Sequence, residues 1–217
     1  MPFDMDHFER SYDTEIFPVK IGSHRLRFYK PASIDRFINT DDPLNGFPLW
    51  AKIWEASAVM AQYLADLPVV PGERILELGA GLGVAGIVAA VLGHDVTLTE
   101  YDANALNFLR ANVVLNHCGS ARVAPLDWFA PDLEGHFDMI IGSEIVYQQN
   151  AVEALGRIFQ QYLSPEGKVV LAERVRPTGA VFFEKMAGTY DIRTQKRTLR
   201  FKDKTETVVL FELSKRS

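Results

Sequence analysis

The sequence has few of the features that mark secreted, membrane-bound or metal-dependent proteins. Its 217 residues include one cysteine, Cys118, so it can form neither an internal disulfide nor a cysteine-based zinc site. Its five histidines show no metal-ligand spacing, and we expect no metal. The longest apolar stretch, residues 84–92, is far shorter than the ~20 residues that a membrane-spanning helix needs. Because the N-terminus also lacks the pattern of a secretory signal, we expect a cytoplasmic protein without a membrane anchor.

Neither sign of charge is in large excess, with 23 Lys and Arg against 28 Asp and Glu and a net charge of −5. Such a chain has no overall positive field to hold a polyanion, so nucleic acid is an unfavoured partner. The exception is a local run of basic residues near the C-terminus: Arg193, Lys196, Arg197, Arg200, Lys202 and Lys204. A run of this kind is typical of a solvated strand face, and contact with RNA or an acidic protein is the alternative.

Hydrophobic periodicity predicts a doubly wound α/β domain over residues 47–217. Helices are expected at 50–67, 83–92, 103–116, 151–163 and 178–186, alternating with strands at 74–78, 95–99, 122–126, 137–142 and 168–172. Two final strands, 190–199 and 206–213, have no helix-length connection between them and must pair antiparallel. Residues 1–46 predict a separate extension, in which strands 16–21 and 26–29 form a β-hairpin and a turn-rich linker follows.

A glycine-rich segment, Ile75-Leu76-Glu77-Leu78-Gly79-Ala80-Gly81-Leu82-Gly83-Val84-Ala85-Gly86, leads from a buried strand into a helix. Glycines there let the backbone approach a ligand closely, which is typical of nucleotide sites. Residues 81–86 also fit the dinucleotide fingerprint, but Glu77 places an acid before the first glycine, where a pyrophosphate would be repelled. The sulfonium and ammonium of S-adenosylmethionine would be attracted there, so this cofactor is favoured over NAD. The alternative is that Glu77 is a solvated strand-end residue and the glycines only form a turn.

Acids follow the next two strands. Glu100 ends the second strand at the spacing of a ribose-binding carboxylate, and Asp102 is better placed to cap the following helix. Asp127 and Trp128 end the third strand, where they could bind an adenine amino group and stack on the purine. The alternative for this pair is a solvated turn acid beside a core tryptophan.

The fourth strand runs into Glu144-Ile145-Val146-Tyr147, where we expect the methyl acceptor. Glu144 could hold or orient an amine, and Tyr147 could flank it with its hydroxyl or ring face. The alternative is an exposed loop acid and a core tyrosine. Arg174 and Arg176 follow the fifth strand at the same edge of the sheet, and they either meet substrate or are ordinary surface arginines.

These motifs resemble the seven-strand, class I S-adenosylmethionine-dependent methyltransferases. Within this class, residues 47–147, including Pro48-Leu49-Trp50-Ala51-Lys52-Ile53-Trp54-Glu55-Ala56-Ser57, resemble the family-16 methyltransferase-like protein lysine methyltransferases, such as those that modify the electron-transfer-flavoprotein β-subunit. The resemblance implies a Rossmann-like, mostly parallel seven-stranded sheet with one antiparallel strand near its edge. It also implies a protein substrate that presents a lysine.

The resemblance further assigns roles to single residues. It places Glu77, Gly79 and Gly81 at the methionine part of the cofactor, Glu100 at the ribose, Asp127 and Trp128 at the adenine, and Trp54 nearby. At the acceptor, the family has an Asp before two apolar residues and an aromatic one, where this chain has Glu144. A small-molecule or RNA methyltransferase of the same fold is the alternative, and so is a relative that binds the cofactor without turnover.

Overall fold

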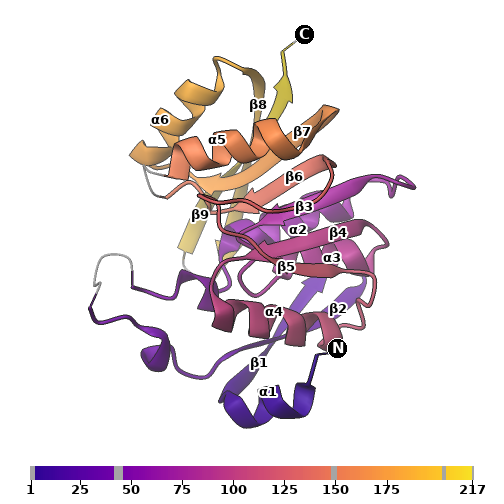
Figure 1. Ribbon diagram of the computed structural model, residues 1–217, viewed down its shortest axis with the longest axis vertical. Coiled ribbons are helices and arrows are strands. Elements are labelled where there is room, and N and C mark those ends of the chain that lie inside the picture. Colours follow the sequence, from indigo (N-terminus) through magenta and orange to yellow (C-terminus); the bar gives the residue numbers. More distant parts are fainter. Residues whose placement is uncertain (1–2, 42–45, 148–150, 202–203, 217) are drawn as a thin grey trace.

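The structure, a computed structural model, describes residues 3–41, 46–147, 151–201 and 204–216. A seven-stranded sheet forms the centre of the molecule, with helices on both of its faces (Figure 1). A separate two-stranded hairpin lies at the opposite end of the molecule from the C-terminus. Among the described residues, no helix is both long and apolar enough to cross a membrane.

The large sheet has the order β5-β4-β3-β6-β7-β9-β8. Its strands are β3 (Arg74–Leu78), β4 (Asp95–Glu100), β5 (Arg122–Pro125), β6 (Phe137–Ser143), β7 (Leu163–Arg174), β8 (Tyr190–Phe201) and β9 (Lys204–Lys215). Strands β3 to β7 pair in parallel, whereas β9 runs antiparallel to both β7 and β8. The order reverses between β3 and β6, which makes the C-terminal end of these two strands the expected ligand site.

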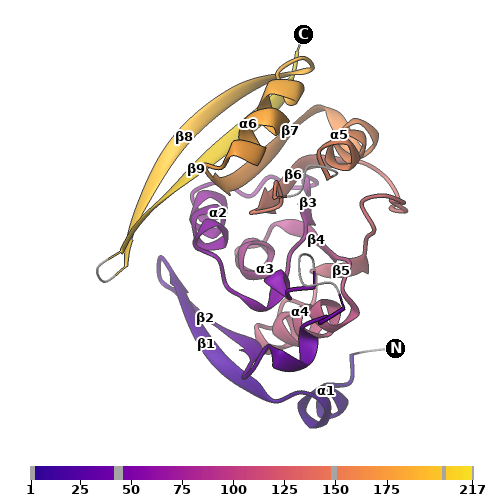
Figure 2. The same cartoon turned by 90° about the vertical axis from the view of Figure 1, so that its left-hand side faces the viewer.

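Two layers of helices cover the sheet, as Figure 2 shows from the side. The helices are α1 (Met5–Ser11), α2 (Glu55–Ala65), α3 (Val84–Val91), α4 (Ala103–Leu115), α5 (Ala151–Tyr162) and α6 (Pro177–Met186), with short 3-10 turns at Asp35–Phe37 and Leu49–Ala51. Alternate residues of β3 face opposite layers: Ile75 packs with α2 and α3, and Leu76 packs with α5 and α6. Burial on both faces explains why the parallel strands are nearly continuous apolar runs.

The predicted α/β fold with an antiparallel C-terminal strand and an N-terminal hairpin is confirmed. Three elements differ clearly from the prediction. The helix expected at 50–67 begins only at Glu55, because residues 49–51 form a 3-10 turn and the backbone of Trp54 is extended. Strand β7 begins earlier than expected because Leu163 already pairs with Phe137. Helix α1 was not predicted; its signal is Asp4, whose side chain caps the helix by accepting a hydrogen bond from the His7 amide at 2.9 Å. Part of the predicted linker, residues 42–45, lies outside the described residues.

The N-terminal hairpin, β1 (Thr14–Ile21) and β2 (His24–Pro31), is attached to α4 through two asparagine side chains. Asn112 accepts a hydrogen bond from the Tyr29 amide at 2.6 Å, and its Nδ2 donates to the carbonyls of Tyr29 at 3.1 Å and Leu82 at 3.0 Å. Asn116 makes the corresponding pair of bonds with Arg27. The two amides thus bind the edge of β2 as a neighbouring strand would, and the extension packs directly on the main domain.

Aromatic rings fill the space between the extension and α4. Phe8 and Phe108 are buried and meet edge to face, with ring centroids 5.1 Å apart. Phe37 and Trp50 continue the cluster, because the ring centroid of Trp50 lies 5.1 Å from that of Phe37 and 5.4 Å from that of Phe108. The N-terminal segment therefore supports Trp50, which lines the cavity described below.

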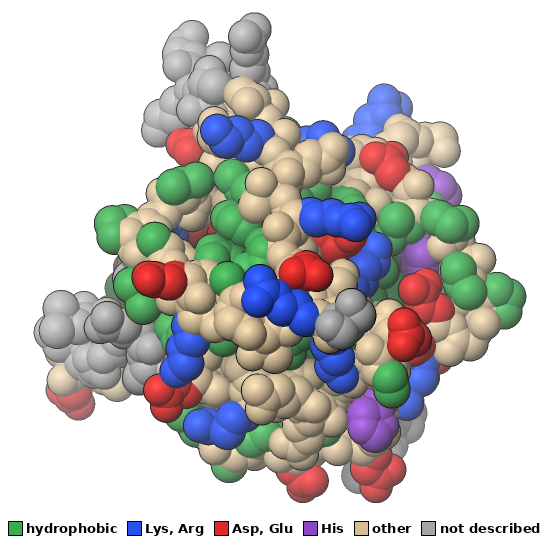
Figure 3. Space-filling view, turned by 90° about the horizontal axis from the view of Figure 1, so that it is seen from above, with side chains coloured by type: hydrophobic (Ala, Val, Ile, Leu, Met, Phe, Trp, Pro, Cys, Tyr) green, Lys and Arg blue, Asp and Glu red, His purple; other side chains and the backbone are tan. Residues whose placement is uncertain are grey.

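The basic residues of the C-terminal hairpin do not share one face. Arg193, Lys196 and Arg197 are exposed on β8, but side chains alternate along a strand, so Lys196 points away from the other two. Lys202 and the side chains of Arg200 and Lys204 lie outside the described residues. On the end of the molecule near α6, basic and acidic side chains are interspersed (Figure 3). This arrangement favours a solvated strand over a polyanion site.

We predict that Asn112→Ala lowers the free energy of unfolding by about 3 kcal/mol, because it leaves buried backbone groups of Tyr29 and Leu82 without partners. Urea denaturation measures this loss as a lower midpoint at an unchanged slope. Asn116→Ala is the matched control. Asn116 makes similar bonds at an exposed site, so its removal should lower the free energy of unfolding by only about 1 kcal/mol. Equal losses in the two variants would contradict the role of Asn112.

Candidate active site

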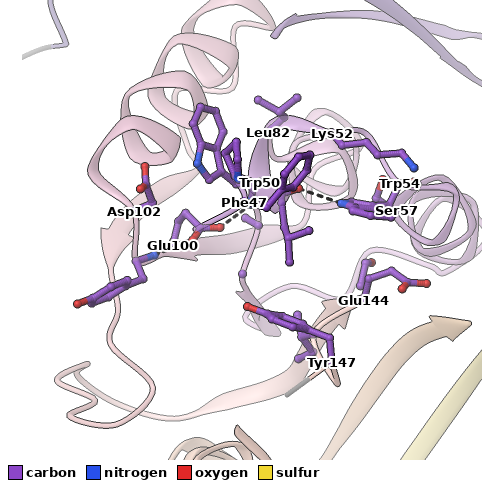
Figure 4. Close-up of a pocket in the computed structure, with 18 of the residues that line it drawn as sticks. Phe47, Trp50, Lys52, Trp54, Ser57, Leu82, Glu100, Asp102, Glu144 and Tyr147 are labelled. Atoms are coloured by element: carbon purple, nitrogen blue, oxygen red, sulfur yellow. Dashed lines mark hydrogen bonds between the residues drawn. The ribbon is translucent and has the colours of Figure 1, made fainter. Parts of the chain in front are cut away.

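A cavity of about 920 Å³ lies at the C-terminal ends of β3, β4 and β6, where the strand order reverses (Figure 4). The nine residues that the sequence assigned to the cofactor or to catalysis all line it: Trp54, Glu77, Gly79, Gly81, Glu100, Asp127, Trp128, Glu144 and Tyr147. Of the two arginines considered for substrate contact, Arg176 lines the cavity and Arg174 does not. Segment 46–54, which precedes α2, covers another side of the cavity. Within the described ranges, no three His, Cys, Asp or Glu side chains gather closely enough to hold a metal ion.

The glycine loop between β3 and α3 depends on glycine for both conformation and space. Gly79, Gly81 and Gly83 have φ angles of 60°, 55° and 84°, in the left-handed region that favours glycine. A Cβ at Gly81 would lie 3.1 Å from the carbonyl oxygen of Trp50, and one at Gly79 would lie 3.2 Å from the indole of Trp128. Larger residues at these positions would push the loop away from its neighbours and reshape the cavity.

Glu77 is buried at 3% exposure, so the alternative of a solvated strand-end residue is wrong. Its carboxylate accepts a hydrogen bond from the Gly86 amide at 3.0 Å, in the first turn of α3. The pKa of Glu77 is raised to about 8, chiefly by burial, with the Gly86 bond lowering it and the charge of Glu100 adding to the increase. The protonated form of Glu77 is therefore favoured at neutral pH when no cation lies beside it.

Glu100 ends β4 with both carboxylate oxygens facing backbone amides. It accepts hydrogen bonds from Gly81 at 2.9 Å and Tyr101 at 2.8 Å, and burial raises its pKa. The carboxylate is thereby fixed against the glycine loop (Figure 4). Asp102 caps α4 as predicted, since its carboxylate accepts hydrogen bonds from Asn104 and Ala105.

Asp127 and Trp128 form the side of the cavity that follows β5. Asp127 accepts a hydrogen bond from the Phe129 amide at 2.8 Å, which stabilises the turn. Trp128 is half-buried and packs with its ring edge beside Gly79. The acid is thus a turn residue that also borders the cavity, and the indole forms part of the wall next to the glycine loop.

Glu144 adopts a left-handed conformation, with φ at 57°, which is uncommon for a residue other than glycine. Its buried carboxylate accepts hydrogen bonds from the Arg174 amide at 2.9 Å and from Arg174 Nε at 3.2 Å, and it pairs with Arg176. The alternative of an exposed loop acid is therefore wrong. The sequence did not indicate these contacts, which depend on how β6 and β7 align.

Glu173 is a buried residue behind the site that sequence reasoning missed. It is 3% exposed, and its carboxylate accepts hydrogen bonds from the amides of Ile145 at 2.9 Å and Val146 at 3.2 Å. Burial and the neighbouring Glu144 raise its pKa to about 8. The available signal was an acid directly after the apolar run 169–172. Glu173 holds the chain between Glu144 and Tyr147 in place.

Tyr147 and Trp54 border the cavity near Glu144. Tyr147 is 37% exposed rather than part of the core, and burial of its ring, followed by the charge of Glu100, raises its pKa. Trp54 donates from Nε1 to the Leu49 carbonyl at 3.0 Å (Figure 4). The Lys52 Nζ lies 4.0 Å from the centre of the Trp54 ring, and the Arg174 guanidinium lies 5.1 Å from it. Cationic groups therefore gather at this end of the cavity.

Comparison with known families identifies the chain. Residues 44–189 match the model of the family described as lysine methyltransferase, which covers most of the main domain. The chain belongs to this family.

Two curated relatives support the assignment. The protein N-lysine methyltransferase METTL21A of Danio rerio is 38% identical over 134 residues, which are 58% of this chain and 61% of that protein. The electron transfer flavoprotein beta subunit lysine methyltransferase of Mus musculus is 26% identical over 136 residues, 60% of this chain and 52% of that protein. The similarity to the lysine methyltransferase family therefore spans less than two thirds of each relative.

A solved structure gives the same fold. TYW2 of P. horikoshii, in complex with MeSAdo, aligns with a TM-score of 0.63 at 17% identity, over 94% of this chain and 72% of that one. At this identity, the likeness shows the fold alone. It agrees with the predicted class I architecture of the lysine methyltransferase family.

We predict that Glu77→Gln reduces the pH dependence of stability. Folding raises the pKa of Glu77 from 4.5 to about 8, so its contribution is complete below pH 4.5 and is lost as the pH rises through 8. Gln can still accept the Gly86 bond but does not titrate. Thermal unfolding measured at several pH values checks this. Raising the pH from about 5 to about 9 should lower the melting temperature of the wild type by several degrees more than that of the variant.

The control is Glu153→Gln on α5, an exposed residue whose pKa is lowered by Lys185. Its melting temperature should follow that of the wild type across this pH range. Parallel curves for Glu77→Gln and the wild type would show that Glu77 does not take up a proton on folding.

Proposed function

We propose that the protein is an S-adenosylmethionine-dependent N-methyltransferase whose acceptor is a lysine side chain of another protein. The observation that carries the proposal is the single cavity that joins the Glu77 glycine loop and Glu100 to the exit of β6 at Glu144 and Tyr147. One end offers carboxylates to a cationic cofactor, and the other is open to an acceptor. Family membership supports the same reaction.

The described residues fit this cofactor better than a dinucleotide. Four acids line the cavity around the glycine loop: Glu77, Glu100, Asp102 and Asp127. Carboxylates here would repel a pyrophosphate, whereas a sulfonium or ammonium beside Glu77 would lower its raised pKa and be attracted to the charged form that results. The cavity of about 920 Å³ is in the range for a ligand of this size. When bound, S-adenosylmethionine supplies a methyl group on a positively charged sulfur.

Each part of the cofactor has a proposed partner. Gly79 and Gly81 would receive the methionine part beside Glu77, because a backbone without Cβ atoms allows close approach. The Glu100 carboxylate would accept hydrogen bonds from the ribose hydroxyls. Asp127 and Trp128 would hold the adenine, the first by a hydrogen bond and the second by ring contact, with Trp54 nearby.

At the acceptor end, Glu144 and Tyr147 are the proposed catalytic residues. A lysine amine has a pKa of about 10.4 and must lose its proton before it can attack. Glu144 Oε2 pairs with Arg176 and, like any carboxylate oxygen, has a second lone pair with which to orient the amine. Tyr147 would flank the amine with its hydroxyl or ring face.

The two relatives described above are both named as lysine methyltransferases, which supports lysine as the acceptor. Their names differ in the protein modified, so they give no single substrate for this chain. Glu144, which stands where the family has an Asp, is a further reason to determine the substrate directly. A cytoplasmic location stays a prediction based on the single cysteine.

We predict that Glu100→Ala weakens the binding of S-adenosylhomocysteine about 10- to 100-fold, since it removes a charged acceptor of two hydroxyl groups. Isothermal titration calorimetry measures the effect. Asp95→Ala is the control, because Asp95 lies at the opposite end of the same strand and pairs with Arg122 on the surface. Unchanged affinity for S-adenosylhomocysteine in Glu100→Ala would show that Glu100 does not bind the cofactor.

Methyl transfer is tested with S-adenosylmethionine carrying a labelled methyl group and a cell lysate as the source of acceptors. We predict labelled protein whose hydrolysate contains methyllysine. Glu144→Gln, which keeps an acceptor for the Arg174 amide but loses its charge, should lower the rate on the order of 10- to 100-fold while S-adenosylhomocysteine still binds.

Glu153→Gln is the matched control for this substitution, because Glu153 is exposed and pairs with Lys185. It should transfer methyl at the wild-type rate. Label found in RNA or in small molecules, and not in lysine, would show that the proposed acceptor is wrong. Full activity of Glu144→Gln would show that Glu144 has no catalytic role.

A further inference from the structure

A second, smaller hollow adjoins the acceptor end of the cavity. Its volume is about 390 Å³, and it is lined by Arg174, Val175, Arg176, Glu206 and Thr207. Arg176 lines both the cavity and this hollow, so the two meet at that side chain. The hollow lies where β7 ends beside the beginning of β9. A chain that placed a lysine in the cavity would have its neighbouring residues close to this hollow.

The two arginine side chains are held in position before any ligand binds. Glu144 pairs with both, and Arg174 also lies over the Trp54 ring. Their side chains nevertheless keep 28% and 32% of their surface exposed, against 5% for Glu144. Arg174 bonds to Glu144 through Nε, and neither of its terminal amino groups donates to a partner within the described part of the chain. These groups can still donate to a ligand, and little side-chain entropy would be lost.

The charges of this cluster do not cancel at neutral pH. Glu173, the buried acid beside the arginines, has its pKa raised to about 8, mainly by burial, which favours its neutral form at pH 7. Two other carboxylates, Glu144 and Glu206, then face the guanidinium groups of Arg174 and Arg176. Lys52, which is positioned against Trp54, adds a further positive charge nearby.

We propose that Arg174 and Arg176 form a recognition subsite for an acidic side chain of the protein acceptor, an Asp or Glu close in sequence to the lysine that is methylated. The subsite rests on the proposed function and adds to it a sequence preference of the substrate. A planar guanidinium matches a carboxylate in shape and charge, and a pair joined through Glu144 fixes the direction of approach. Val175, at 75% exposure, lies between the two arginines in the chain and offers apolar contact to the same peptide.

Glu206 allows the sign of the ligand's charge to be tested. It lies on the wall of the hollow with the arginines and is half-buried, and it would repel an acidic ligand. Removing its charge should therefore strengthen binding of the acidic peptide, whereas removing the charge of Arg176 should weaken it. A role that only maintained the fold would not produce opposite effects from these two substitutions.

The test uses short fluorescent peptides with one central lysine, flanked by glutamates, by glutamines or by arginines, and the full-length protein saturated with S-adenosylhomocysteine. Fluorescence anisotropy should show the glutamate peptide binding about 5- to 10-fold more tightly than the glutamine peptide, and the arginine peptide binding least. Arg176→Gln should abolish this preference, Glu206→Gln should increase it, and high salt should reduce it. Arg193→Gln, an exposed arginine of β8 that lines neither hollow, is the matched control.

Equal binding of the three peptides, no binding by any of them, or an unchanged preference in Arg176→Gln would overturn the proposal. Competition by oligouridylate as strong as by the glutamate peptide would also overturn it, since the surface would then bind any anion. The proposed function fails separately, through loss of S-adenosylhomocysteine binding or of lysine labelling in lysate. Lysine labelling without a preference for the glutamate peptide would support the proposed function and contradict only the subsite.

Discussion

The Glu77 carboxylate reaches the amide of Gly86 because residue 86 has no Cβ, which would lie 2.3 Å from the carboxylate oxygen. This contact fixes the first turn of α3 to the end of β3. Neighbouring bonds extend the same arrangement: the Thr99 hydroxyl donates to the Glu77 carbonyl at 2.6 Å, and Ala80 donates to the Thr99 carbonyl at 2.9 Å. Glu100 then meets the loop at Gly81. The position of each cavity acid along β3 and β4 therefore depends on a glycine-rich backbone that leaves room for carboxylates.

The N-terminal extension is also connected to the glycine loop. Asn112 joins Tyr29 of the hairpin and Leu82 of the glycine loop through one buried amide group. The aromatic cluster supports Trp50, whose carbonyl oxygen lies against Gly81. A disturbance of the hairpin would thus reach the cavity through side chains rather than through the sheet. This explains how a segment outside the central sheet contributes a wall of the candidate site.

The sequence predicted what depends on local pattern. The central strands are continuous apolar runs, and Asp102 precedes a helix in the capping position, so both could be located from short stretches of sequence. The surroundings of Glu144 could not, because its partners lie some thirty residues away in the chain and meet it only through the register of β6 and β7. Helix α1 was missed because it is short and buries a single residue, Phe8. Burial of Glu77 likewise follows from how α3 packs, which no local pattern records.

Charge is divided along the cavity in a way that suits the proposed reaction. Acids surround the glycine loop, whereas Arg174, Arg176 and Lys52 gather near the exit of β6. Nearby positive charge lowers the pKa of an ammonium, and so favours the neutral amine that can attack. A lysine within an acidic segment has the opposite tendency in solution, because its neighbours stabilise the charged form. Under the proposed recognition, Arg174 and Arg176 would pair with those acidic neighbours and remove that stabilisation, so that binding the flanking residue and releasing the lysine proton become parts of one event.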